Sequence, residues 1–179
     1  MYIGEWLLSD MDRIHNVSQQ SGGWEGWAQV ELAMFLKSKY NSIARERRNY
    51  HTNTSDSFDF WIKPQMGNGN IGIELKVRLK DESDAEFRTR LLYDFEKIVV
   101  DKGPSTEHCP AETYAVAITT DMSDIKAFPS VLRFMSGQNL FARGPFALDS
   151  INYIEVAGGL FGTKIMYIVG WKESWLNTK

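Results

Sequence analysis

"GIELKVRL", residues 72–79, is the stretch of sequence from which the predicted fold is built. Its aliphatic residues are typical of a buried β-strand, yet Glu74 and Lys76 stand among them. Side chains two residues apart on a strand share a face, so Glu74, Lys76 and Arg78 line one face and the aliphatic side chains line the other. The ordinary interpretation of such a charged face is contact with solvent.

The segment before it, "SFDFWIKP" at residues 57–64, also alternates like a strand. The alternation predicts Asp59 and Trp61 on one face and three apolar side chains on the other, namely Phe58, Phe60 and Ile62. Pro64 ends this strand and the turn residues "QMGNGN" follow, which predicts a hairpin. Asp59 and Glu74 are therefore expected on neighbouring strands.

Helical patterns flank this hairpin. Residues 1–20 contain a short helix, and residues 24–40 are apolar nearly all round, which predicts a buried helix. Residues 85–102 carry apolar side chains at helical spacing, which predicts an amphipathic helix with one face toward the core.

The remaining segments complete the predicted architecture. They predict an edge strand, a central strand, a further helix and a closing hairpin, at residues 42–56, 113–120, 123–138 and 151–171 respectively. In this order the elements form a mixed α/β sandwich, with a sheet between helices.

The composition is that of one soluble globular domain over residues 1–179, with 43% hydrophobic and 24% charged residues. The apolar runs are too short to span a bilayer and the N-terminal segment lacks the basic region of a secretory signal, so we expect a cytoplasmic protein with no membrane partner. Cys109 is the single cysteine, which excludes an internal disulfide and a cysteine-based zinc site. Because the net charge is −3, contact with nucleic acid would need a local basic patch.

Three acidic residues stand in apolar surroundings: Glu31 within "AQVELAMF", Asp59 in an aromatic strand and Glu74 in an aliphatic one. Buried carboxylates usually need a partner, because their desolvation costs several kcal/mol. Each of the three acids allows an ordinary interpretation, since Glu31 can cap or pair, Asp59 can face solvent, and Glu74 can bridge to Lys76 or Arg78. Taken together, they form a pattern that also suggests a site.

This pattern resembles the PD-(D/E)xK phosphodiesterase superfamily, the restriction-endonuclease-like nucleases. The resemblance covers about residues 22–120 and rests on "FDFWI" with Asp59, on "IELKV" with Glu74 and Lys76, and on an acid in the preceding helix. The helix "RLLYDFEKI" also resembles the one that follows the Glu-x-Lys strand in many members. One departure is Phe58, which stands where the motif has proline.

The resemblance implies a restriction-endonuclease-like three-layer sandwich, a central mixed β-sheet flanked by helices, with residues 150–171 completing or extending the sheet. It also implies that Asp59, Glu74 and the backbone carbonyl of Leu75 hold Mg²⁺ or Mn²⁺, and that Lys76 orients the attacking water or stabilises the phosphorus. The helix acid would bind a second ion or a metal-bound water.

Two residues compete for the role of helix acid. Glu31 is preferred for its more apolar surroundings, and Glu25, with Gln29 one turn on, is the rival. They are six residues apart and hence lie on different faces of the helix.

Basic residues that could contact phosphates are Arg47, Arg48, Arg78 and Lys80. On the later helix, Arg90–Asp94 and Lys97–Asp101 have the i,i+4 spacing of a salt-bridged, solvated face, which is the interpretation we prefer for them.

The expected function is that of a metal-dependent endonuclease acting on nucleic acid, with DNA favoured over RNA. Cutting both strands would suggest a homodimer. The alternative is a catalytically inactive module that uses the same fold for binding or regulation. The other site types considered are weaker, because the three histidines lack metal-binding spacing and the glycine-rich stretches lack the lysine of a phosphate-binding loop.

Overall fold

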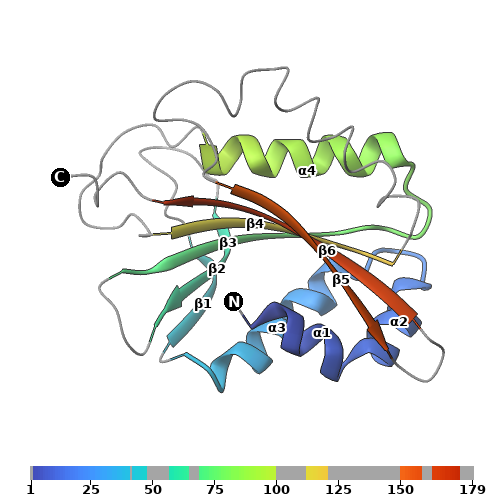
Figure 1. The fold of residues 1–179 in the computed structure, drawn as a ribbon, viewed down its shortest axis with the longest axis horizontal. Coiled ribbons are helices and arrows are strands. Elements are labelled where there is room, and N and C mark those ends of the chain that lie inside the picture. Colours follow the sequence, from blue (N-terminus) through green and yellow to red (C-terminus); the bar gives the residue numbers. More distant parts are fainter. Residues whose placement is uncertain are drawn as a thin grey trace.

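The computed structural model describes residues 2–40, 42–47, 57–64, 69–99, 112–120, 150–158 and 163–173. Its helices are α1 (Ile3–Ser9), α2 (Met11–Ser18), α3 (Glu25–Lys37) and α4 (Asp84–Val99). Figure 1 shows α4 on one face of a sheet and the other three helices on the opposite face. The predicted mixed α/β sandwich is confirmed. No helix in the described part of the chain is long and apolar enough to cross a membrane.

The sheet has six strands in the order β1-β2-β3-β4-β6-β5. Their bounds are β1 (Ser42–Arg47), β2 (Phe58–Lys63), β3 (Ile71–Val77), β4 (Glu112–Thr119), β5 (Ser150–Gly158) and β6 (Thr163–Glu173). Strands β3 and β4 run parallel, and each of the other neighbouring pairs is antiparallel. A parallel pair needs a long crossover, and α4 lies within the one that joins β3 to β4. The strand order and these pairings confirm the predicted hairpins, the edge strand (β1) and the central strand (β4).

The main core lies between the sheet and helices α1–α3. From β3 it receives Ile73, Leu75 and Val77, the aliphatic residues of the alternating pattern, and all three are inaccessible to solvent. The helices contribute large side chains of their own, including Trp6, Leu32 and Leu36. The alternation of the sequence therefore predicts this face of β3 correctly.

The charged face of β3 is largely shielded from bulk solvent, because α4 packs over it. Glu74 is only 2% exposed, and Lys76 pairs with Asp94 of α4. The solvated-face interpretation is therefore wrong. Burial on both faces is the usual condition of a strand that has a parallel neighbour.

Phe58 departs from the predicted alternation of β2. Its ring lies 5.9 Å from the ring of Trp61 and is absent from the core cluster that contains Phe60 and Ile62. It also covers Gly72, where a Cβ atom would lie 2.8 Å from the Phe58 ring. Phe58 therefore packs with Trp61, on the side opposite to the one that the period of two predicts.

Other predictions need correction at the helices. The N-terminal 20 residues form two helices, not one. Helix α3 is buried on one side only, and Val30 and Met34 are 41% and 60% exposed. The predicted helix at residues 123–138 lies outside the described residues.

Candidate active site

The site is built where β2 and β3 separate. Their pairing ends at Phe60 and Ile73, one residue short of Asp59 and Glu74. Beyond the last paired residue of β3, the backbone N–H of Leu75 donates to Oδ2 of the Asp59 side chain at 2.7 Å instead of to a carbonyl of β2. The Asp59 side chain thus replaces a strand partner, which holds its carboxylate beside β3.

The carboxyl group of Glu74 lies close to that of Asp59, and a hydrogen bond from it is among the influences that lower the pKa of Asp59. The other oxygen of Asp59, Oδ1, accepts a 2.8 Å hydrogen bond from the amide Nε2 of Gln29 on α3. Burial raises the pKa of Asp59 above its ordinary value, and the hydrogen bond from Leu75 and the charge of Lys76 only partly oppose this. A buried and a partly buried carboxyl group lying close together favour uptake of a proton or a cation.

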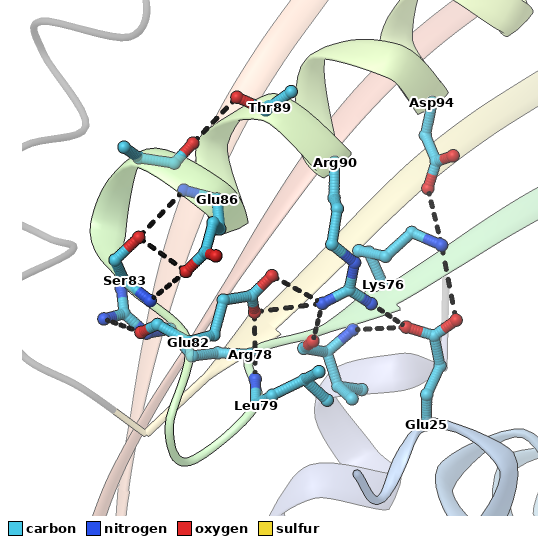
Figure 2. A network of polar contacts seen from close by, with 12 residues as sticks. Glu25, Lys76, Arg78, Leu79, Glu82, Ser83, Glu86, Thr89, Arg90 and Asp94 are labelled. Carbon is cyan, nitrogen blue, oxygen red and sulfur yellow. Dashed lines mark hydrogen bonds and ion pairs between the residues drawn. The ribbon is translucent and has the colours of Figure 1, made fainter.

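Lys76 lies near enough to Asp59 for its charge to lower the Asp59 pKa, and its ammonium group is held by two further carboxylates. Its Nζ lies 3.3 Å from Oε1 of Glu25 and 3.4 Å from Oδ2 of Asp94 (Figure 2). Burial lowers the pKa of Lys76, but the charges of Asp94 and Glu25 outweigh it, so this pKa lies above its ordinary value. Lys76 is therefore a permanent cation at neutral pH.

Glu25, and not Glu31, is the helix acid that reaches this group. Besides Lys76, Glu25 binds Nη2 of Arg90 at 2.6 Å and lies 3.4 Å from the N–H of Val77. Glu31 points to α2, where it pairs with Arg13 at 2.9 Å. The preference for Glu31 is therefore wrong. Apolar neighbours in sequence were a poor guide, because α3 presents different faces to α2 and to β3.

Arg90 and Asp94 do not form the predicted i,i+4 pair. The Arg90 guanidinium donates hydrogen bonds to both carboxylate oxygens of Glu82, at 2.8 and 2.9 Å, and also to Glu25 (Figure 2). Asp94 is buried and pairs with Lys76. This part of α4 therefore faces the site, whereas the sequence interpretation placed both residues on a solvated face. The predicted pair Lys97–Asp101 lies outside the residues whose side chains are described.

Arg78 is a structural residue rather than an exposed phosphate contact. Its guanidinium donates to Oδ1 of Asp84 at 2.7 Å and to the carbonyl of Glu82 at 3.0 Å, and it lies over the ring of Phe87. These contacts fasten the start of α4 to the end of β3. The predicted role of Arg78 in contacting nucleic acid is corrected accordingly.

The other predicted basic contacts have mixed outcomes. Lys80 is exposed and lines a groove of about 810 Å³ between the α2–α3 connection and the start of α4. Glu82 and Arg90 line the same groove, so it adjoins the polar network of the site. The side chain of Arg47 and all of Arg48 lie outside the described residues. Arg45, in the same basic segment as Arg47 and Arg48, donates to Oε1 of Gln29 at 3.0 Å.

The donor set fits a magnesium-like ion better than zinc. Among the residues described, no group of three or more His, Cys, Asp or Glu side chains is placed to hold a metal ion. Mg²⁺ commonly takes only one or two carboxylates and completes its shell with waters and substrate phosphates, whereas structural zinc takes four protein ligands. The contacting carboxyl groups of Asp59 and Glu74 are such a pair.

Comparisons with protein-family models, with curated proteins and with solved structures find no match to this chain.

Proposed function

We propose that the protein is a metal-dependent endonuclease that hydrolyses phosphodiester bonds in nucleic acid. The observation that carries the proposal is the meeting of Asp59 and Glu74 where β2 and β3 part, with the Lys76 ammonium alongside. Two acids from paired strands and one lysine are the groups that the resemblance to the PD-(D/E)xK nucleases requires.

The carboxylates of Asp59 and Glu74 would hold Mg²⁺ or Mn²⁺. When bound, such an ion lowers the pKa of a coordinated water and offsets charge on the phosphate. Leu75 supports the same position, because the N–H and carbonyl of one strand residue face the same neighbour and its N–H faces Asp59. Its carbonyl is therefore the proposed third protein ligand.

Lys76 would stabilise the negative charge that develops on the phosphorus-bound oxygens. A cation fixed in advance does this without reorganisation during the reaction. The carboxylates of Glu25 and Asp94 keep Lys76 charged and limit its movement. Gln29 orients the Asp59 carboxylate by donating to Oδ1.

The order of elements agrees with the same proposal. Helix α3 precedes the β2–β3 hairpin, and α4 leads to the parallel strand β4, which is the core order that a restriction-endonuclease-like fold implies. The resemblance makes DNA the preferred substrate, although the site chemistry needs only a phosphodiester. Double-strand cleavage would call for two such sites, for which a homodimer is the simplest arrangement.

A non-catalytic binding module is the second candidate, and one observation favours it. Lys76 is engaged by two carboxylates, as it would be in a purely structural ion-pair cluster. The two candidates differ in what they predict for cleavage, because only the endonuclease consumes its substrate.

Supercoiled plasmid, single-stranded DNA and RNA are incubated with the protein in Mg²⁺, in Mn²⁺ and in EDTA. We expect metal-dependent cleavage, and we expect Asp59→Ala and Lys76→Ala each to lower its rate by about 10²–10³-fold. Glu31→Ala is the matched control, because Glu31 is an acid on the same helix as Glu25 but pairs with Arg13, and its rate should match the wild type. Binding of nucleic acid without cleavage in either metal would instead identify the binding module.

A further inference from the structure

Glu25 has both of its carboxylate oxygens occupied by cations of the protein. Its Oε1 lies 3.3 Å from the Lys76 ammonium and its Oε2 lies 2.6 Å from the Arg90 guanidinium. The latter is among the shortest contacts expected for a charge-assisted hydrogen bond. The negative charge of the Glu25 carboxylate is therefore compensated by two cationic side chains of the protein itself.

Arg90 is fixed in this place from its other side as well. Its Nη1 donates to both oxygens of Glu82, whose side chain is only 5% exposed, and lies 3.4 Å from the carbonyl of Val77. A guanidinium is a permanent cation with a planar set of N–H donors. Arg90 is thus a resident cation that bridges α3 and α4 next to the Lys76 side of the site (Figure 2).

We propose that the Arg90 guanidinium takes the place of a second metal ion, so that the site binds one divalent ion per chain, at Asp59 and Glu74. The inference rests on the proposed function, since it assumes that this pair binds a metal. A second ion on Glu25 would have to displace Arg90 or lie beside it, and two cations at such a separation repel each other strongly.

Arg90 would also supply part of the positive charge that a second metal ion supplies in sites that bind two ions. It keeps Glu25 compensated, and Glu25 in turn keeps Lys76 in position. Arg90 is therefore a positioning residue, and the number of bound ions is a readout that a merely structural role would not change.

The experiment counts Mn²⁺ ions bound to the full-length protein, from the electron paramagnetic resonance signal of free Mn²⁺ during a titration. The wild type should have one high-affinity site for Mn²⁺, and any further Mn²⁺ should bind more weakly. Arg90→Met removes the charge and keeps most of the side-chain length, and should bind two. Arg90→Lys retains a cation and should bind one.

Matched variants locate the additional ion. Arg13→Met releases Glu31 in the same way, away from the site, and should leave the number at one. The double variant Arg90→Met/Glu25→Gln should return to one ion. Arg90→Met/Glu82→Gln should keep two, which separates Glu25 from the other acid that the substitution releases.

The outcomes distinguish the inference about Arg90 from the proposed endonuclease function. Two ions on the wild type, or one on a folded Arg90→Met, would overturn the inference. Absence of any bound ion, with Asp59→Asn indistinguishable from the wild type, would overturn the proposed function instead. If Arg90→Met fails to fold, Arg90→Gln, which also removes the charge, decides in its place: two bound ions would support the inference and one would overturn it.

Discussion

At the scale of single residues, the account depends on how Asp59 is held. A carboxylate that accepts one hydrogen bond from a strand amide and one from a side-chain amide has little freedom to rotate. Glu74 lies close enough to Asp59 to help lower its pKa. Under the proposed function this arrangement would hold Asp59 ready for a cation shared with Glu74, because groups around a metal ligand set its orientation.

Gln29 should therefore matter for metal affinity although it is not a proposed ligand. Gln29→Leu removes the hydrogen bond to Asp59 at similar volume, and we expect affinity for Mn²⁺ to fall by about 10–100-fold, as is typical when a group that orients a ligand is lost. Arg45→Met, which removes the contact behind Gln29 and leaves the Gln29 side chain in place, should have a smaller effect. Equal affinities for Gln29→Leu and the wild type, by calorimetric titration, would refute this role.

At the scale of elements, the β2–β3 hairpin shows which features could be predicted from sequence. The alternation in residues 71–77 and the turn residues before it predict the strands and their pairing, because both depend on local preferences. Phe58 could not be placed this way. The Phe58 ring occupies the space that a side chain at position 72 would fill, and a period of two carries no information about such a contact.

The same contact gives a stability prediction. Gly72→Ala would put a methyl group 2.8 Å from the Phe58 ring, and overpacking of this kind typically costs about 1–3 kcal/mol. Gly26→Ala is the matched control, because nothing lies within 4 Å of its added methyl group and it is in helix α3. We expect that variant to be more stable than the wild type by about 0.5–1 kcal/mol. Urea unfolding measures both, and a Gly72→Ala variant as stable as the wild type would contradict the packing described.

At the scale of the whole molecule, the site joins segments far apart in sequence. Asp59, Glu74 and Lys76 could be predicted because a hairpin brings them together locally. Glu25 and Arg90 could not be paired from sequence, since 65 residues separate them and their contact exists only once α3 and α4 cover opposite faces of the sheet. Local charge patterns instead favoured Arg90–Asp94, because a helix in isolation would form that pair.

The most direct test of the central claim is a crystal of the protein soaked in Mn²⁺, with the anomalous signal used to locate the ion. The account predicts one Mn²⁺ contacting the carboxylates of both Asp59 and Glu74, with Arg90 still bound to Glu25. Density for these two carboxyl groups turned away from each other, with no ion between them at saturating Mn²⁺, would contradict it.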